Sequence, residues 1–325
     1  MLPLVSVVIP CFNAEAWVAE ALDSCLAQTY PNVEIIVVDD GSTDGSVEIL
    51  RRYGDRIAWE QLPQRGGGNV ARNRGFARSR GEYVFFLDAD DYILPEKLAR
   101  QVAFLEKTGH DAVFGDWQAL FHDPDGTTRL SEVVRSGPQA DVLEALLADW
   151  WTAVVSLLYR RSAVERVGGW DETLPVAQDR DFFLSVVLSG ARVGYLPGCM
   201  GVYRRQGGGT VSTASKSRWI DGHARVVRKA GEVLRRENRL TPAYRRAMAR
   251  SYFKLARAGL RLSYGLYGRM LGEALAIDPT FQPADERAPY RWATRLVGFR
   301  PTERLASFGW WAWVQLEAGF KGRSA

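Results

Sequence analysis

The stretch GEYVFFLDADD, residues 81–91, decides the expected fold, because five apolar or aromatic residues (83–87) run directly into Asp88, Asp90 and Asp91. A short continuous apolar run predicts a strand that is buried on both faces, as in the middle of a parallel sheet. The acidic residues then fall at the carboxyl edge of the sheet, where open α/β folds bind their ligands. Neighbouring carboxylates repel one another, so this cluster favours a bound Mg²⁺ or Mn²⁺. A solvated acidic turn is the alternative.

The sequence on both sides of this stretch alternates between strand and helix patterns. Strands are expected at 4–9, 34–38 and 57–62, and helices at 14–28, 46–53 and 70–79. Further on, we expect helices at 95–108, 141–149 and 179–189, with strands at 111–121, 153–159 and 192–196. Such alternation predicts βαβ units in an α/β fold, a mostly parallel sheet flanked by helices. Because the crossovers are right-handed, the loops after the first, second and fourth strands gather along one edge.

The chain changes character near residue 215. Residues 216–325 hold 22 Lys and Arg against 9 Asp and Glu, whereas residues 1–215 hold 20 against 29. Long helices are expected at 219–238 and 243–276, so we predict a domain at 1–215 and a basic helical region at 216–325. A basic region suits nucleic acid, an anionic membrane or an acidic acceptor, or simply presents solvated helix faces. Of these, nucleic acid is not among the partners that we predict.

Composition excludes several kinds of protein. Three widely separated cysteines and three scattered histidines give no disulfide framework, zinc motif or catalytic triad. The N-terminal MLPLVSVVIP lacks a basic start and breaks at Pro10, so it predicts a strand and no signal peptide. No run of 18 apolar residues occurs, which argues against a membrane-spanning helix. We therefore expect a cytoplasmic protein.

The usual phosphate-binding loops are missing. A dinucleotide-binding fold needs GxGxxG after its first strand, but residues 10–15 are PCFNAE. The loop GxxxxGK[ST] is also absent. If this fold binds a nucleotide, its phosphates would then need a metal.

Five motifs together resemble the family 2 glycosyltransferases. They are SVVIPCFNAE (6–15), VVDDGSTD (37–44), ARNRG (71–75), GEYVFFLDADD (81–91) and GGWDETLPVAQDRDF (168–182). The resemblance covers roughly residues 4–212. It implies inverting enzymes with the A-type nucleotide-sugar fold, in which a sugar moves from a nucleoside diphosphate, most often UDP, to an acceptor hydroxyl.

The resemblance also assigns the donor site. Asp88-Ala89-Asp90 matches the DxD motif of the family, so Asp90 would bind the metal and Asp88 the ribose or a metal-bound water. An aromatic ring at Phe12 offers a stacking face, and the Asp40 carboxylate suits a uracil or thymine imide. Core packing for Phe12 and turn capping for Asp40 are the alternatives. The full set implied for the donor nucleotide is Pro10, Phe12, Glu15, Asp40, Gly68, Arg72 and Asp88.

On the acceptor side, the resemblance implies that Asp179 is the base that takes the proton of the acceptor hydroxyl. Because Asp179 lies at a predicted helix start, a capping role is the rival interpretation. Gln178 stands where the family usually has glutamate, and Gln206 where it often has histidine. The weaker candidates for contact with acceptor or phosphate are Trp170, Asp171, Gln178, Arg204, Arg205 and Gln206.

Residues 308–313 form an aromatic cluster, FGWWAW, within the basic tail. Tryptophan beside basic residues is typical of interfacial membrane segments. Peripheral membrane contact is therefore one expectation, and packing on the catalytic domain or a second subunit is the other. The predicted function is a metal-dependent inverting transferase with a carbohydrate or lipid-linked acceptor, in polysaccharide, glycolipid or other cell-surface glycan synthesis. A non-catalytic nucleotide-sugar sensor and a sugar-phosphate nucleotidyltransferase are the alternatives.

Overall fold

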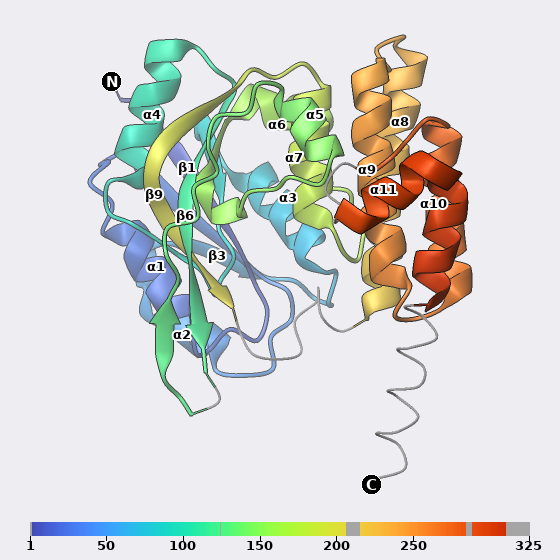
Figure 1. Ribbon diagram of the computed structural model, residues 1–325. Coiled ribbons are helices and arrows are strands. Elements are labelled where there is room, and N and C mark those ends of the chain that lie inside the picture. The colour runs from blue at the N-terminus through green and yellow to red at the C-terminus, as the bar shows by residue number, and fades with distance from the viewer. Residues whose placement is uncertain (1, 124, 206–214, 284–287, 310–325) are drawn as a thin grey trace, which may run out of the picture. The chain divides into compact units, whose positions relative to one another are not determined.

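The structure, a computed structural model, describes residues 2–123, 125–205, 215–283 and 288–309. These residues divide into two compact units (Figure 1). The N-terminal unit comprises Met1–Leu143 and Trp151–Ala214, and the helical unit comprises Glu144–Trp150 and Ser215–Ala325.

The N-terminal unit alternates strands and helices as the sequence predicts. In chain order its elements are β1 (Val5–Cys11), α1 (Val18–Leu26), β2 (Val33–Asp39), α2 (Ser46–Arg52), η1 (Gly54–Arg56), β3 (Ala58–Gln61), α3 (Gly68–Arg78), β4 (Tyr83–Phe86), β5 (Tyr92–Ile93), α4 (Lys97–Thr108), β6 (Ala112–His122), β7 (Thr128–Leu130), α5 (Val142–Leu147, at the boundary of the two units), η2 (Val154–Ser156), β8 (Leu157–Arg160), α6 (Arg161–Val167), α7 (Gln178–Leu188) and β9 (Val193–Arg205).

One mixed sheet organises this unit, with the strand order β3-β2-β1-β4-β8-β6-β9-β5 and β7 paired to β6. The predicted α/β fold class is confirmed. Strands β1, β2, β3 and β4 pair in parallel, as do β6 and β9, whereas β8, β5 and β7 pair antiparallel to their neighbours. The chain moves outward from β1 to β3 and then returns to place β4 on the other side of β1. The carboxyl ends of β1 and β4 are thus a topological switch point, where such sheets bind ligands.

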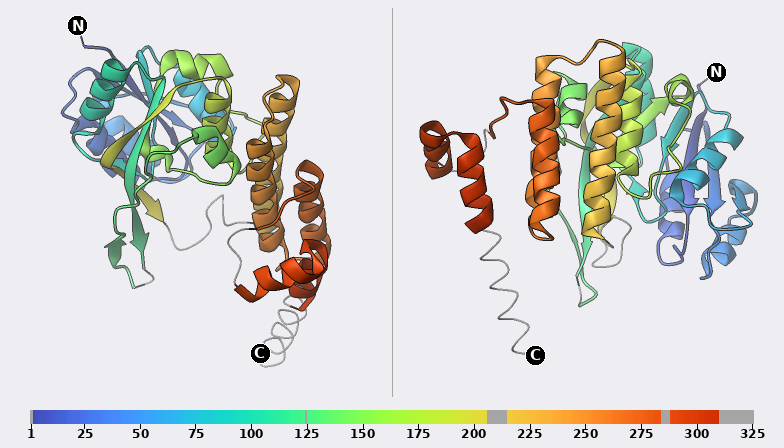
Figure 2. Two further views of the ribbon diagram at one scale, coloured as in Figure 1. Left: turned by 45° about the horizontal axis from the view of Figure 1, so that its top comes forward. Right: turned by 90° about the vertical axis from the view of Figure 1, so that its right-hand side faces the viewer.

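Helices cover both faces of the sheet, so its central strands are apolar on both sides. Helices α1, α2 and α4 lie on one face, and α3, α6 and α7 on the other (Figures 1 and 2). Along β1, Val7 and Ile9 belong to the core with α1 and α4, whereas Val8 faces α3. At Gly75 the backbone of α3 approaches β1 so closely that a Cβ would lie 2.5 Å from Cγ1 of Val8. This close packing fixes α3 over the switch point.

Three expected elements differ in the structure. The strand expected at 192–196 continues as β9 to Arg205, because it pairs in parallel with β6 past a bulge at Gly115–Trp117. The strand expected at 153–159 begins as the turn η2, in which the Ser156 hydroxyl donates to the Ala153 carbonyl. The helix expected at 243–276 is two helices, because Ser263 starts a new one by accepting from the Leu266 N–H.

The helical unit contains α8 (Lys216–Arg236), α9 (Pro242–Gly259), α10 (Tyr264–Ile277) and α11 (Ala288–Val297), followed by helical residues 299–309. The fully buried Glu303 accepts hydrogen bonds from Arg257, Tyr267 and Tyr290, which ties 299–309 and α11 to α9 and α10. None of the described helices is both long and apolar enough to cross a membrane. Of the expected aromatic cluster, residues 310–313 lie outside the described part of the chain.

The approach of α3 to β1 gives a testable expectation. In Gly75→Ala the added methyl meets Val8, so we expect a loss of about 1–3 kcal/mol in the free energy of unfolding. Gly268→Ala in α10 is the control, because a Cβ there meets nothing within 4 Å and alanine favours a helix by about 1 kcal/mol. Thermal denaturation of both variants would check this. A Gly75→Ala protein as stable as wild type would contradict the proposed close packing.

Candidate active site

One end of the candidate site is built from the carboxyl ends of β1 and β2 and the loop before α3. Asp40 follows β2, and its backbone N–H donates to the Cys11 carbonyl at 2.7 Å. Its two carboxylate oxygens accept the N–H groups of Gly66 and Gly67 at 2.6 and 2.8 Å. Asp40 therefore fastens the glycine loop, and with it the start of α3 at Gly68, beside the end of β1.

Phe12 and Glu15 lie in the segment that follows β1. Phe12 is only half-buried, which disfavours a core role, and the Arg65 guanidinium lies 3.9 Å from its ring centroid. Glu15 is exposed and accepts the Gly45 N–H at 2.6 Å, which links this segment to the start of α2. Pro10 is the residue of β1 that pairs with Val38. The structure thus gathers the predicted base-side residues at one edge of the sheet.

Arg72 connects this end to the acidic cluster. Its buried guanidinium donates from Nη2 to Asp88 Oδ1 at 2.6 Å and from Nη1 to Gln178 Oε1 at 3.3 Å. Burial acts to lower the pKa of Arg72, but the carboxylates of Asp88, Asp179 and Asp90 outweigh it and raise the pKa. Arg72 is therefore a fixed cation that holds α3, the end of β4 and the start of α7 together. With only 6% of its surface exposed, Arg72 is not a solvated residue of the α3 surface.

The carboxylates after β4 destabilise one another's charged forms. Burial, followed by the charge of Asp88, raises the pKa of Asp90 to about 6. For the fully buried Asp91, burial and then Asp90 and Asp88 raise the pKa well above its usual value. The alternative of a solvated acidic turn is therefore excluded for Asp91 and does not fit Asp90.

Asp179 joins this cluster from α7. The helix begins at Gln178, and its N-terminal cap is Ala177 in a left-handed conformation (φ 61°) without a side-chain cap, so the capping interpretation of Asp179 is wrong. Desolvation and then the charge of Asp88 raise the pKa of Asp179 to about 6, against the opposing effect of Arg72. Asp179 as a residue is exposed. Its carboxyl group therefore loses water where it faces the protein and remains open to solvent on the other side. A carboxylate with this pKa can take up a proton near neutral pH.

Arg204 has a different task from the one expected. It was predicted to be available for phosphate, but its side chain is only 3% exposed. Its backbone N–H donates to Asp91 Oδ1 at 2.8 Å, and its guanidinium donates to the Asp90 carbonyl at 2.7 Å and also contacts Glu20. The structure thus uses Arg204 to attach the end of β9 to the acidic turn. Arg205 is exposed, and Gln206 lies outside the described residues.

Trp170 and Asp171 lie in a turn that is clamped to α3. Asn73 bonds the backbone of Trp170 through both N–H and carbonyl, and Asn69 donates to the Asp171 carbonyl at 2.7 Å. The Trp170 ring stacks on Phe182 at 4.2 Å, and the Arg72 guanidinium lies 4.4 Å from its centroid. Trp170 is only 4% exposed, and its indole supports Arg72. Its acceptor contact and that of Asp171 remain predictions.

Sequence reasoning missed the residues that hold these groups in place. They are Asn69 and Asn73 on α3, Trp17 and Glu20 at α1, and His122 at the end of β6. Only the motif ARNRG, which contains Asn73, offered a signal for any of them. The others are polar or aromatic residues in ordinary helix and strand positions, whose partners are far away in the sequence.

The donor set at the end of β4 fits a hard divalent cation. Asp91 Oδ2 is buried without a hydrogen-bond partner, and neighbouring carboxylates add to the effect of burial in raising the pKa values of Asp90 and Asp91. Both features mark a surplus of oxygen ligands and negative charge. Within the described ranges, no group of three or more His, Cys, Asp or Glu side chains forms a complete ligand set. Mg²⁺ commonly takes one or two carboxylates and completes its shell with water and substrate phosphates, so two carboxylates suffice.

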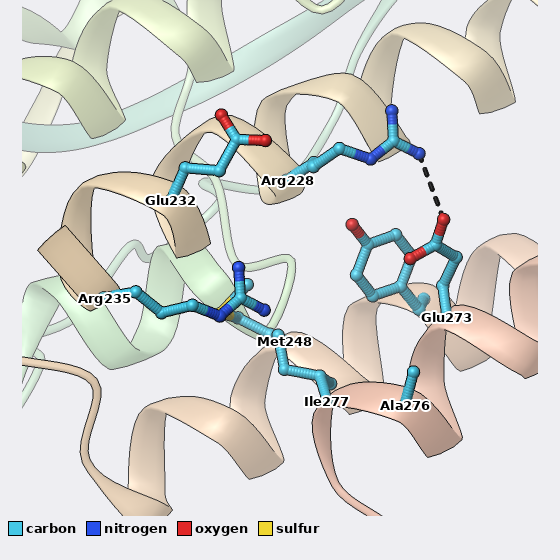
Figure 3. Close-up of a pocket in the computed structure, with 8 residues that line it drawn as sticks. Arg228, Glu232, Arg235, Met248, Glu273, Ala276 and Ile277 are labelled. Atoms are coloured by element: carbon cyan, nitrogen blue, oxygen red, sulfur yellow. Dashed lines mark hydrogen bonds and ion pairs between the residues drawn. The ribbon is translucent and has the colours of Figure 1, made fainter.

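The helical unit contains a separate hollow of about 250 Å³ between α8, α9 and α10 (Figure 3). Arg228 pairs with Glu273 across it at 3.2 Å. Both positive and negative side chains line the hollow, so it does not have the uniformly positive potential of an anion-binding site. The lining residues are Arg228, Glu232, Arg235, Met248, Tyr252, Glu273, Ala276 and Ile277.

An α/β sheet with this strand order, a clustered set of carboxylates at its switch point and a helical C-terminal region defines an A-type nucleotide-sugar transferase fold. The sequence model of glycosyl transferase family 2 matches residues 6–168, half of the chain, so the chain belongs to that family.

Relatives and solved structures agree with this assignment. An uncharacterized glycosyltransferase of Haemophilus influenzae is 34% identical over 164 residues, which cover 50% of this chain and 64% of the relative. TuaG of Bacillus subtilis, named for teichuronic acid biosynthesis, is 37% identical over 139 residues, 39% of this chain and 55% of TuaG. The chain thus spans less than two thirds of these relatives.

Two solved structures show the same fold at low sequence identity. Residues 1–349 of S. aureus TarS, in complex with UDP-GlcNAc, match with a TM-score of 0.69 and 22% identity over 94% of this chain and 92% of that one. A mannosyltransferase of Pyrobaculum calidifontis, in complex with GDP-Man and Mn²⁺, matches with a TM-score of 0.55 and 21% identity over 95% and 88%.

The raised pKa of Asp90 predicts how stability depends on pH. The folded protein holds this proton up to about pH 6, whereas the unfolded chain releases it near pH 4. Stability is therefore lost as the pH rises between these values. In the presence of chelator, the Asp90→Asn variant should exceed wild type in free energy of unfolding by about 1–3 kcal/mol at pH 7.5. At pH 4, where Asp90 is protonated in both the folded and the unfolded wild type to a large extent, the difference should be small. Thermal unfolding against pH would check this, and an equal effect at both values would contradict it.

Proposed function

We propose that the protein is an inverting glycosyltransferase that moves a sugar from a nucleoside diphosphate sugar to an acceptor hydroxyl. The observation that carries the proposal is the convergence of Asp88, Asp90 and Asp179 around Arg72. Asp88 and Asp90 lie in the turn after β4, while Asp179 comes from α7 about ninety residues later. Direct displacement needs a leaving-group site and a base on opposite sides of the sugar. The turn after β4 would provide the leaving-group site, and α7 would provide the base.

The donor nucleotide binds, in this proposal, between Phe12, Asp40 and the loop before Gly68. The half-buried Phe12 ring offers a stacking face, which Arg65 extends. Each Asp40 oxygen accepts one backbone N–H, and a carboxylate oxygen has a second lone pair for an imide N–H. We favour UDP as the nucleotide. The complex of TarS with UDP-GlcNAc supports this choice, although the P. calidifontis neighbour was solved with GDP-Man.

Asp88 and Asp90 would bind the diphosphate together with Mg²⁺ or Mn²⁺. Asp90 would hold the ion, and Asp88 would bind ribose or a metal-bound water. Such an ion, when bound, neutralises the charge of the departing nucleoside diphosphate. Arg72 holds Asp88 in position for this contact through the 2.6 Å bond between Nη2 and Oδ1.

Asp179 acts as general base in this proposal. Its pKa of about 6 leaves it ionised at neutral pH yet basic enough to take the acceptor proton as the new bond forms. Gln178, where a glutamate was expected, binds Arg72 without adding a further negative charge beside the base. The acceptor is a carbohydrate of a polysaccharide, glycolipid or related cell-surface glycan, for which the name of TuaG is the support.

Ligand-dependent stability provides the first test. UDP at about 100 times its Kd should stabilise the wild type by about 2.7 kcal/mol with Mn²⁺ present, and much less in chelator. Asp90→Asn should lose this difference. In Asp179→Asn the Mn²⁺-dependent stabilisation by UDP should remain. The rates of sugar transfer and of UDP-sugar hydrolysis should fall at least 100-fold.

This experiment also separates the alternatives. A wild type that binds UDP but never releases it from a UDP-sugar would be the nucleotide-sugar sensor. Formation of a nucleotide sugar from a nucleoside triphosphate and a sugar phosphate would indicate the nucleotidyltransferase. Equal stabilisation by UDP with metal and with chelator would refute the metal dependence.

We also propose that the helical unit attaches to an anionic membrane surface. Trp292, Leu296, Leu305 and Phe308 are each more than half exposed, at 67%, 63%, 74% and 58%. The single acidic residue of the described segment 288–309 is the fully buried Glu303, so the exposed charge of this segment is positive. Exposed apolar side chains among basic ones are typical of interfacial helices.

Vesicle binding tests this attachment. The double variant Trp292→Ser and Leu305→Ser changes exposed positions, so its fold should be retained. We expect wild type to sediment with phosphatidylglycerol vesicles and the variant to bind these vesicles several-fold more weakly. Neither protein should bind phosphatidylcholine vesicles. Leu130→Ser, at an exposed position of β7, is the control. Equal binding of variant and wild type would count against the proposal.

A further inference from the structure

Three aromatic side chains form a group at the edge of the acidic cluster. Trp117 of β6, Tyr203 of β9 and Trp151, which precedes η2, pack with centroid distances of 5.2 Å for Trp117–Trp151, 5.9 Å for Trp117–Tyr203 and 6.4 Å for Trp151–Tyr203. Trp117 is only 5% exposed and forms the base of the group, whereas Trp151 is 46% exposed. We name these three residues the aromatic platform.

The path of β9 places the platform next to the site. Side chains alternate along a strand, so Tyr203 points to the opposite face from Arg204, whose backbone N–H donates to Asp91. Burial raises the pKa of Tyr203, and the carboxylates of Asp91, Asp88 and Asp179 raise it further, which puts the phenol within electrostatic range of all three. The platform therefore adjoins the metal-binding turn, and Tyr203 also lies close enough to Asp179 to be affected by its charge.

From this placement we propose that the aromatic platform binds a pyranose ring of the acceptor, with Trp151 as the residue that stacks on it. The proposal rests on the proposed glycosyl transfer and adds its acceptor subsite. An acceptor hydroxyl must reach Asp179, and an apolar aromatic face near that carboxylate can hold the C–H face of a sugar while its hydroxyls remain in water. Tyr203 supports Trp151 and adds a hydroxyl for hydrogen bonding.

The exposure of Trp151 is what distinguishes it from a core residue. Packing alone accounts for Trp117, which is buried, but it does not require Trp151 to keep nearly half of its surface in solvent. The other described tryptophans of the N-terminal unit are buried or half-buried. Trp170, one of the acceptor candidates from the sequence, is only 4% exposed and packs against Phe182 and Arg72. Trp151 is thus the better candidate for a sugar contact.

The test compares acceptor use with donor use. Wild type, Trp151→Ala and Trp151→Phe are assayed with UDP-glucose, UDP-galactose and UDP-GlcNAc in Mn²⁺, with p-nitrophenyl β-glucoside, β-galactoside and β-N-acetylglucosaminide as acceptor probes. UDP release without acceptor reports on the donor site. We expect Trp151→Ala to raise the KM for the glycoside about tenfold, a much larger change than that in kcat or in acceptor-free UDP release. Trp151→Phe should restore most of the affinity.

Leu130→Ala is the matched control, because Leu130 is also an exposed apolar residue of the N-terminal unit, at 47%. It should leave the KM for the glycoside unchanged. An unchanged KM in Trp151→Ala, or a loss of KM, kcat and UDP release to the same extent, overturns the proposal. So does a wild type that releases UDP but neither transfers to nor binds any of these glycosides by saturation-transfer NMR. A wild type that releases no UDP instead refutes the proposed function itself.

Discussion

The site depends on the attraction between two buried arginines and a set of carboxylates that repel one another. Asp88, Asp90 and Asp91 follow the apolar strand β4; Asp91 is buried and the other two are half-buried, so water screens their charges only in part. Arg72 contacts Asp88 from α3, and Arg204 contacts the backbone of Asp90 and the carboxylate of Asp91 from β9. Removing one partner of such a buried set leaves a charge unpaired, which costs several kcal/mol. The cluster therefore determines where α3 and β9 must lie.

This arrangement neutralises the cluster only in part. Asp90 and Asp179 keep pKa values of about 6, so the protein without a ligand retains carboxylates that gain from a cation or a proton. Stability sacrificed in this way is common at sites that bind charged ligands or transfer protons. Asp179 differs from Asp90 because it is exposed and lies on the helix α7, where it can meet a molecule that arrives from solvent. The same cluster of carboxylates thus raises the pKa of Asp90, which suits a cation, and that of Asp179, which suits a proton.

The sequence predicted the parts of this site that follow from strand ends. Parallel strands bring their carboxyl ends to one edge, so Phe12, Asp40 and Asp88 could be placed together from the apolar runs that precede them. Asp179 was assigned only through resemblance to a family, because its distance from Asp88 depends on how α7 packs. The break before Ser263 was missed because the apolar periodicity of α9 continues into α10. Patterns report local preference, whereas a chain reversal depends on tertiary packing.

Arg204 and Trp151 show why the remainder of the site could not be predicted. In the sequence Arg204 belongs to the polar run YRRQGGG, which suggests an exposed loop. In the structure, pairing with β6 extends β9 to Arg205, and the Arg204 side chain is buried. Trp151 and Trp170 are both tryptophans near turns, and only packing shows that one is covered and the other open. Strand β9 connects these observations, because Arg204 points to Glu20 and His122 on one side and Tyr203 to Trp151 on the other. A single strand end thereby joins the acidic turn to the exposed aromatic side chain of Trp151.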